Sequence, residues 1–468
     1  MKRRAAETQS FASARIVPMT TRIFLAVCLL LPTTSLAAEF KVSTFSADVT
    51  IPIGHRCMGV LPTKSKKIVD RLYVHGFALL GSDKPIVFCA VDWCEIRNGA
   101  YDQWRDGLAK TAGTTRERVL VSSLHQHDAP VTDSGAAKLL RERGLKNELY
   151  DEAFHADTIK RVSAALKQSL KDAKPVTHIG LGQARVKQIA SNRRVILTNG
   201  RVSYGRYSSA GRDKFHATAP DGLIDPFLKT ISFWNGSKAM VAMHCYATHP
   251  MSYYGRGEVT SDFVGLARER RQRDDQSIKQ IYFSGCSGDV TAGKYNNGTP
   301  DSRLRLIDRL YKAMVASWKN TKKTPLTKIG FRNTKLALEF HPSSKLTRKS
   351  LESRLNDKKQ KVEARVLAAM GLSSRLRIAS GQKIDFPCVD LGAAQVVLFP
   401  GESFVGYQLM AQKMRPKSFV MSIGYGECWP GYIPLKQNFK ENFGDSWLWV
   451  GASSEDRIRV ALEKVLKP

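Results

Sequence analysis

One order of predicted secondary structure recurs three times along this chain: two apolar strands, a helix and a further strand. The three units cover residues 72–127, 227–289 and 385–429. A strand joined by a short turn runs antiparallel to its partner, whereas a strand reached through a helix returns in parallel. The pattern therefore predicts an α/β fold of mixed β-sheets with helices packed on their faces, built from about three β-β-α-β-like units.

Polar residues stand at the strand ends of all three units. They are Asp92, His249 and Glu402 after the second strands, and His125, His127, Asp289 and Tyr432 at or near the ends of the last strands. Loops at one edge of a sheet are where α/β proteins usually build their sites. Asp92 is a site candidate only because of this repeat. It would stand behind a ligand histidine and orient its ring.

The segment SSLHQHDAP (122–130) places two histidines one residue apart after an apolar run. Residues i and i+2 of a strand point to the same face, so His125 and His127 would reach one common point, as a metal ion or a polarised substrate requires. A chance pair on a solvated strand is the alternative. The metallo-β-lactamase pattern fails at Asp128 and Pro130, and the cupin, His-Glu-x-x-His and Gly-x-Ser-x-Gly patterns fail as well.

The first residues have the features of an export signal. Basic residues precede the apolar run 23–32, and small residues follow it near Ala37 and Ala38. The run is too short to span a bilayer comfortably. We therefore expect a signal peptide over residues 1–38, with Met19 as an alternative start, and a mature protein that is secreted or periplasmic.

The mature chain is strongly basic, with 68 Lys and Arg against 41 Asp and Glu after residue 38. This excess favours anionic surfaces such as a membrane or an acidic polysaccharide, and general surface character would explain it equally well. No nucleic-acid-binding motif is present, so we expect no nucleic-acid partner. We expect the basic segment 343–385 to be a charged, solvated helical insertion. Seven cysteines remain, an odd number that leaves at least one unpaired within the chain.

Six short motifs occur in an order that resembles the neutral ceramidase family, zinc-dependent amidases that split ceramide into sphingosine and a fatty acid. They are SSLHQHDAP (122–130), CYATHPMSYYG (245–255), TSDFVGLAR (260–268), GCSGDVTAG (285–293), LFPGESF (398–404) and GYGECWPGYIP (424–434). The resemblance begins at FSADVTIPIG (45–54) and runs to GYIPLKQNF (431–439), which is nearly all of the mature chain. It implies a single catalytic domain over 39–468 without the family's C-terminal immunoglobulin-like domain.

Carried over by position, the resemblance implies four ligands for one Zn²⁺ per chain: His125, His249, Glu402 and Tyr432. Two neutral imidazoles and a carboxylate leave a zinc ion with a net positive charge and a position open for water. His127 would move a proton or stabilise the developing oxyanion. Each ligand also has an ordinary alternative: His249 as a packed turn residue, Glu402 as a helix cap and Tyr432 as a half-buried aromatic.

Three segments bear on the substrate side of the site. The family's Gly-Asp-Val-Ser-Pro-Asn, whose serine has been proposed as a nucleophile, reads GDVTAGKYN here, so Asp289 and Thr291 are catalytic candidates that could also be turn formers. SNRR (191–194) resembles the family's Asn-Arg-Ser and makes Asn192 a substrate-binding candidate. NFGDSWLW (442–449) replaces an expected acidic Tyr-Glu segment, so the wall facing the substrate would differ.

The leading hypothesis is an exported zinc amidase that cleaves ceramide or a related N-acyl lipid with zinc-activated water. A second hypothesis keeps the metal site but changes the substrate to another amide or an ester, such as an N-acetylated sugar. A third is a catalytically silent binder of acidic glycans or membranes.

Overall fold

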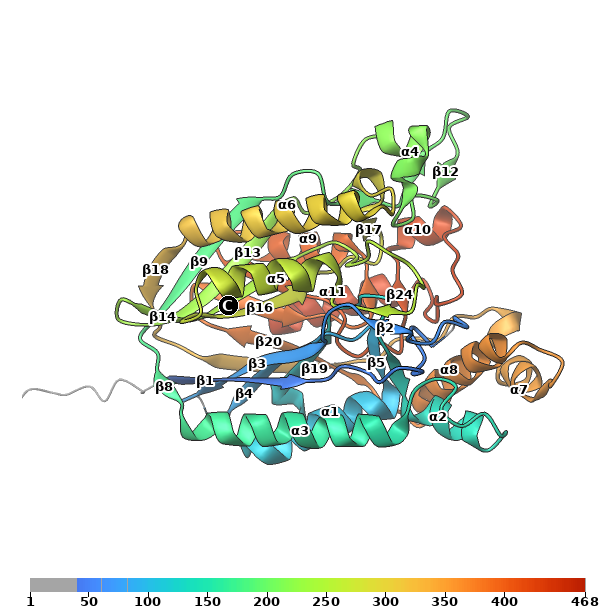
Figure 1. Cartoon of the computed structure of the whole chain (residues 1–468), viewed down its shortest axis with the longest axis horizontal. Coiled ribbons are helices and arrows are strands. Elements are labelled where there is room, and N and C mark those ends of the chain that lie inside the picture. The colour runs from blue at the N-terminus through green and yellow to red at the C-terminus, as the bar shows by residue number, and fades with distance from the viewer. Residues whose placement is uncertain (1–39, 60, 82, 468) are drawn as a thin grey trace, which may run out of the picture. The chain divides into compact units, whose positions relative to one another are not determined.

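The three predicted units fold as three separate mixed sheets (Figure 1). A computed structural model of the chain describes residues 40–59, 61–81 and 83–467, which all belong to one compact unit. The expected signal peptide, residues 1–38, lies outside the described residues.

The strand order of the three sheets follows one pattern. The first contains β1 (Lys41–Asp48), β3 (Tyr73–Leu80), β4 (Ile86–Val91), β6 (Val119–Ser123) and β8 (Lys174–Pro175). The second contains β9 (His178–Arg185), β13 (Phe227–Asn235), β14 (Lys238–Tyr246), β16 (Lys279–Ser284) and β18 (Lys322–Pro325). The third contains β19 (Gly330–Leu336), β20 (Ile384–Asp390), β21 (Ala394–Leu398) and β23 (Phe419–Ile423). Their spatial orders are β6-β4-β3-β1-β8, β16-β14-β13-β9-β18 and β23-β21-β20-β19.

The pairing directions confirm the predicted units. In each sheet the hairpin strands are antiparallel, and the last strand returns in parallel: β4 with β6, β14 with β16 and β21 with β23. The returning connections are the helices α1 (Asn98–Ala112), α5 (Asp262–Asp274) and α9 (Val405–Met414). The structure adds one earlier strand to each unit, β1, β9 or β19, which pairs antiparallel with the first hairpin strand.

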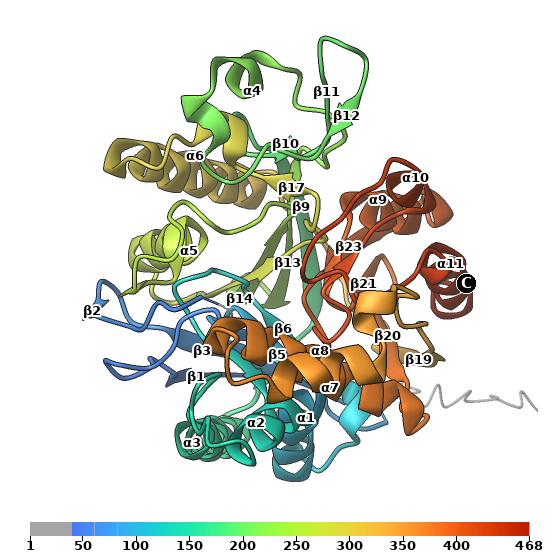
Figure 2. The same cartoon turned by 90° about the vertical axis from the view of Figure 1, so that its right-hand side faces the viewer.

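Helices cover one face of each sheet and the opposite faces share a core (Figure 2). Beside α1, α5 and α9 lie α3 (Glu152–Lys171), α6 (Pro300–Lys319) and α11 (Ser454–Val465), which pack on β1, β9 and β19 respectively. Between the sheets, Phe88 of β4 meets Phe283 of β16 with ring centroids 6.4 Å apart, and Met421 of β23 joins the same cluster. Removing this apolar surface from water is the main force that holds the sheets together.

The ends of the three returning strands meet in the middle of the molecule. The Ser123 amide donates a hydrogen bond to the Tyr425 carbonyl (3.0 Å), and the Gly424 amide donates to the Ser284 carbonyl (2.8 Å). A Cβ at Gly424 would lie 2.8 Å from the Gly285 carbonyl oxygen, so only glycine permits this approach. The carboxyl ends of all six parallel strands therefore face one region.

Most of the remaining elements are short, α8 being the exception, and they lie mostly in loops beyond these strand ends. The strands are β2 (Lys67–Ile68), β5 (Glu95–Arg97), β7 (Val131–Asp133), β10 (Ser191–Asn192), β11 (Val195–Ile196), β12 (Val202–Ser203), β15 (Glu258–Val259), β17 (Val290–Thr291), β22 (Glu402–Ser403) and β24 (Tyr432–Ile433). The helices are α2 (Ser134–Arg141), α4 (Lys214–Thr218), α7 (Arg348–Asn356), α8 (Val362–Ala379) and α10 (Lys436–Lys440).

The segment 343–385 is helical, as expected, but it is not solvated throughout. Helix α8 packs against α2 and α7 and buries Val366, Ala369 and Met370 completely. The Trp449 ring fills the space where a Cβ of Gly371 would stand, at 2.2 Å. α8 is therefore part of the core, and its arginines lie at the core's edge.

The cysteines form no disulfide within the described residues. All seven, from Cys57 to Cys428, are free and buried. In the same part of the chain, no helix combines the length and apolar character needed to cross a bilayer.

We expect Asp390→Asn to lower the free energy of unfolding by about 1 kcal/mol at pH 7, after allowance for solvent screening. Burial raises the pKa of this carboxyl, but hydrogen bonds from Lys328, the Gly392 amide and Arg332 outweigh burial and lower the pKa to about 2. Because the folded pKa is depressed, the stabilisation is present above the unfolded pKa near ~4 and is lost as the pH falls towards 2.

Thermal melting checks this prediction. The midpoints of the Asp390→Asn variant and the parent chain should differ at pH 7 and converge as the pH falls from about 4 towards 2. A difference that stays constant with pH would show that the charge of Asp390 does not stabilise the turn between β20 and β21.

Candidate metal centre

Each sheet places a short parallel bridge just beyond its parallel strands, and three of the four candidate ligands, His249, Glu402 and Tyr432, stand on these bridges. β22 pairs with β24, which sets Glu402 opposite Tyr432. His249 forms a parallel bridge with Thr291. The corresponding bridge in the first unit, β5 with β7, begins at Glu95, which the sequence reasoning missed. His249 and Glu402 therefore occupy equivalent places in two of the three units.

Three of the four predicted ligands bring one donor atom each to a common point. His125 Nε2 lies 3.1 Å from His249 Nε2 and 3.2 Å from Glu402 Oε2, and His249 Nε2 lies 3.3 Å from Glu402 Oε2. Edges of this length belong to a tetrahedron whose centre is about 2.0 Å from each corner, which is the usual distance of zinc from nitrogen and oxygen ligands. The three atoms thus have the spacing of a zinc site with one corner left open.

Hydrogen bonds hold both imidazoles in the form that binds metal. His125 Nδ1 lies 3.0 Å from the Cys94 carbonyl oxygen, and His249 Nδ1 lies 3.0 Å from that of Ser287. Because a carbonyl can only accept, each Nδ1 carries the proton and each Nε2 presents its lone pair to the centre.

The electrostatics of the centre favour a cation. Glu402 is buried, and its Oε2 accepts no hydrogen bond within the described part of the chain. Burial lowers the pKa of His249 well below its usual value, with help from Arg193, so this ring is neutral. Burial also opposes a charge on His125, but the Glu402 carboxylate outweighs it and raises the pKa of His125. The buried Glu402 carboxylate therefore favours positive charge at this point, which a bound divalent cation would supply.

The two histidines of SSLHQHDAP lie together, but not for the predicted reason. β6 ends at Ser123, so His125 and His127 do not alternate along a strand. His125 instead has a left-handed backbone (φ 73°), a conformation that costs about 1–3 kcal/mol outside glycine. The two rings meet at 90° with centroids 5.2 Å apart. A strained turn, and not the pleat of a strand, aims both at the centre.

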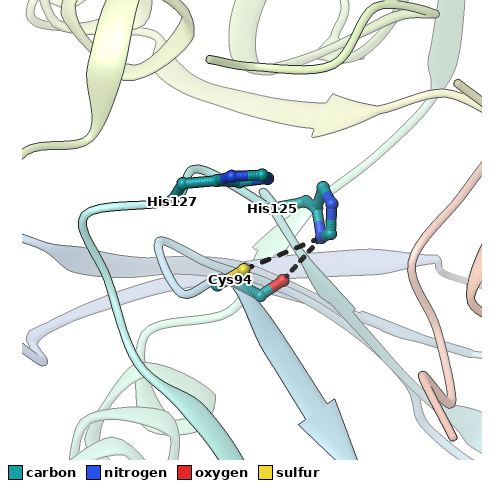
Figure 3. A group of neighbouring side chains, drawn as sticks. All are labelled: Cys94, His125 and His127. Atoms are coloured by element: carbon teal, nitrogen blue, oxygen red, sulfur yellow. Dashed lines mark hydrogen bonds between the residues drawn. The ribbon is translucent and has the colours of Figure 1, made fainter. Parts of the chain in front are cut away.

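A second group of potential donors, Cys94, His125 and His127, lies next to the first (Figure 3). His125 Nδ1 lies 4.0 Å from Cys94 Sγ and already donates to the Cys94 carbonyl. Burial, with Glu95 and Glu402, raises the pKa of the Cys94 thiol well above its usual value, so the thiolate that zinc requires is disfavoured. The group of His125, His249 and Glu402 therefore fits zinc better.

His127 is a buried histidine without an internal partner. Neither ring nitrogen makes a hydrogen bond to any described residue, and the ring lines the cavity above the centre. Burial, with His125 and Arg193, lowers the pKa of His127 well below its usual value, so the ring is neutral. A neutral imidazole with free nitrogens can accept a proton and pass it on.

Tyr432, the fourth predicted ligand, lies beside the centre and is paired with an arginine. Arg193 Nη1 donates a 2.8 Å hydrogen bond to Tyr432 Oη, and its guanidinium also lies over the tyrosine ring. Burial raises the pKa of the Tyr432 phenol well above its usual range. Sequence reasoning named Asn192 in the SNRR segment and missed its buried neighbour Arg193; the signal was the arginine that directly follows Asn192 in the same motif.

The other predicted site residues surround the centre without lining the cavity. Asn192 Nδ2 donates to Asp289 Oδ2 (2.8 Å), and Asp289 Oδ1 accepts from the Val405 amide (2.8 Å). Thr291 Oγ1 accepts from the Gly293 amide (2.9 Å). These contacts tie the second unit to the start of α9. Direct roles of Asn192, Asp289 and Thr291 in binding or catalysis stay predictions.

Asp92 makes no hydrogen bond to a histidine. Its carboxylate forms a buried two-point pair with Arg268 of α5, at 2.7 and 2.9 Å, and accepts from the Tyr73 amide. The backbone carbonyls of Cys94 and Ser287 do the orienting that sequence reasoning assigned to Asp92. Asp92 instead joins the first unit to the second.

The centre lies at the bottom of a cavity of about 710 Å³. Its floor is formed by His125, His127, Arg193, Glu402 and Tyr432. Apolar and aromatic side chains make up much of the wall, namely Met58, Met251, Tyr254, Tyr207 and Trp447. A polar section contains Ser208, Ser209, Asp213, His216, Asp445 and Ser446. Asp445 to Trp447 belong to the segment where the sequence departs from the family pattern.

Two solved structures share this architecture. A crystal structure of neutral ceramidase from Pseudomonas aeruginosa matches 92% of this chain and 74% of its own, with a TM-score of 0.67 and 14% identity. A structure described as ceramidase complexed with C2 matches 92% of this chain and 75% of its own, with a TM-score of 0.66 and 12% identity. This chain has the ceramidase fold. No family model and no curated protein matches the sequence, so the likeness lies in the structure.

Within this ceramidase fold, we expect Tyr432→Phe to weaken zinc binding about tenfold to a hundredfold, the effect typical of losing an interaction that supports a metal site. The substitution removes only Oη, which also accepts the hydrogen bond from Arg193. Competition with a chelator measures the zinc affinity.

Tyr407→Phe is the matched control. Tyr407 is buried as well, but its hydroxyl donates to the Pro434 carbonyl and the side chain does not line the cavity. Equal zinc affinity in Tyr432→Phe and the parent chain would contradict a role of Tyr432 at the metal.

Proposed function

We propose that this protein is a zinc-dependent amidohydrolase that cleaves the N-acyl bond of ceramide or a related N-acyl lipid. The observation that carries the proposal is the convergence of His125, His249 and Glu402 beneath the unpartnered His127, at the bottom of a cavity wide enough for a substrate. The ceramidase fold supports the choice of substrate class.

The residues present divide the chemistry between them. A zinc ion held by His125, His249 and Glu402 would lower the pKa of a water molecule towards ~7 and polarise the amide carbonyl. His127 takes the proton from the attacking water and delivers it to the departing amine, because its nitrogens face the cavity without a partner. Arg193, buried beside Tyr432, places a fixed positive charge where negative charge develops on the carbonyl oxygen.

The cavity wall suits an N-acyl substrate. Met58, Met251 and Tyr254 offer apolar surface for an acyl chain.

The predicted export of the mature chain remains part of the proposal. Burial of every cysteine of the mature chain would protect the free thiols in an oxidising compartment.

The polar section of the wall favours a second candidate, hydrolysis of an amide whose amine half carries hydroxyl groups, such as an N-acetylated sugar. Asp213 holds His216 through Nδ1 at 3.1 Å, and His216 Nε2 has no partner in the described residues. Asp445 and Ser446 lie on the same wall. Carboxylates and imidazoles of this kind bind hydroxyl groups well.

One experiment tests both candidates. The purified full chain is assayed for zinc, and its loaded and chelator-treated forms are given a short-chain ceramide and an N-acetylated amino sugar. Release of sphingosine by the zinc-loaded form alone supports the first candidate, and release of the free amino sugar supports the second. A chain that binds no zinc after supplementation, or cleaves neither compound, overturns the proposal.

A further inference from the structure

We propose that the face around the cavity mouth docks onto an anionic phospholipid bilayer. The inference rests on the proposed function only in that such a bilayer would carry the N-acyl lipid. The surface consists of three loops, here called the rim loops: residues 49–72, 186–226 and 337–383. Each connects the added strand of one unit (β1, β9 or β19) to the first strand of its hairpin (β3, β13 or β20).

The strand pairing sets the rim loops on the side of the metal centre. Asp48 at the end of β1 pairs with Tyr73, and Val74 pairs with Val91 at the end of β4. The same relation holds in the second unit, where β9 leads into β13 beside the end of β14. Figure 1 shows the consequence, since β2, β12, α4 and α8 all lie towards the end of the fold that also holds β17 and β24.

The rim loops carry more than half of the net positive charge of the mature chain. They contain 23 Lys and Arg against 8 Asp and Glu, whereas all residues after 38 contain 68 against 41. More than half of the excess therefore lies in about a quarter of the chain. A concentration of positive charge on one face attracts a negatively charged surface and orients the protein towards it.

The exposed apolar side chains gather in the same loops. Of the ten large apolar side chains exposed in the described residues, seven fall within the rim loops. Ile68 and Val69 are 38% and 45% exposed and directly follow Lys66 and Lys67, which are exposed as well. Tyr207, 65% exposed, stands on the cavity wall itself. Lysines beside apolar tips and aromatic rings are the composition that interfacial binding requires.

The apolar residues at the rim connect directly to the cavity. β2 pairs in parallel with β15, which begins at Glu258, and the half-exposed Tyr254 just before it lines the cavity. The Gly257 amide in the same segment donates to Asp128, the neighbour of His127. A bilayer that receives Ile68 and Val69 would therefore lie against the mouth through which a lipid enters. An acidic polysaccharide would use the lysines but has no apolar phase for these side chains.

Vesicle sedimentation tests the proposal without any enzymatic turnover. We expect the full chain to bind vesicles of phosphatidylcholine with about one fifth phosphatidylglycerol more tightly than pure phosphatidylcholine, and less so as salt is raised. Lys66→Gln with Lys67→Gln should weaken the partition about thirtyfold, from about fivefold for each lysine near an anionic surface. Ile68→Asp with Val69→Asp should weaken it at least as much.

Val460→Asp and Lys464→Glu on α11 are the matched controls, because Val460 is 47% exposed and Lys464 is exposed, outside the rim loops. Both should bind as the parent does, and thermal melting confirms that every variant is folded. Equal losses in rim and control variants, equal binding to both vesicles, or retention on an acidic polysaccharide such as alginate without vesicle binding would overturn the proposal. Vesicle binding by a chain that hydrolyses no N-acyl lipid would overturn the proposed function and leave the docking surface intact.

Discussion

The His249→Ala variant is expected to lose its zinc and at least about a hundredfold in kcat/KM on the N-acyl substrate that the parent chain cleaves. His249 supplies one corner of the three-atom group, and its Nε2 lies within 3.3 Å of both other donors. Without it, His125 and Glu402 remain as two ligands, which hold zinc weakly. The measurements are zinc content by mass spectrometry after dialysis and steady-state kinetics.

His244→Ala separates metal loss from misfolding. His244 lies on β14 a few residues earlier and is as fully buried as His249, but its ring is hydrogen-bonded to Thr230 and Gln280 within the sheet. We expect this variant to melt at a lower temperature and to keep its zinc. Zinc bound as tightly by His249→Ala as by the parent would contradict the assignment of the centre.

The His127→Ala variant is expected to keep its zinc and to lose about 10²- to 10⁴-fold in kcat, the contribution typical of a general acid–base residue. The ring makes no hydrogen bond to a described residue, so its removal breaks no internal hydrogen bond. Its centroid lies 5.2 Å from that of His125, close enough to serve the same reacting water. Kinetics and zinc content of one preparation give both quantities.

Cys94→Ala is the control for this second prediction. Cys94 lines the same cavity and belongs to the neighbouring donor group with His125 and His127. We expect it to retain zinc and most activity because its thiol is protonated. Loss of zinc in both His127→Ala and Cys94→Ala would instead place the metal in that neighbouring group.

A large part of the fold and of the candidate site could be predicted from sequence. The order of two strands, a helix and a strand depends on local periodicity and turns, and it recurs in the structure as β3-β4-α1-β6 and its two counterparts. Polar residues at strand ends then pointed to His249 and Glu402, because parallel strands in one sheet end at one edge. The functional class came from a resemblance in motifs, to which the ceramidase fold now adds a structural likeness.

Other features could not be predicted because they depend on contacts between units. Arg193 reaches Tyr432 across 239 residues of sequence, and no local pattern marks that contact. The left-handed backbone of His125 is disfavoured by local preference, so no sequence pattern predicts it. The partner of Asp92 is Arg268 of α5, a residue with no sequence signal of its own.

The sequence by itself determined three β-β-α-β units and the polar residues that end their strands. Those properties are local, since hydrophobic periodicity and turn residues act over a few positions. Only the tertiary structure decided that His125, His249 and Glu402, one from each unit, bring their donor atoms within 3.3 Å of one another. The packing of three apolar sheet faces into one core sets that distance, because it brings the three strand ends together.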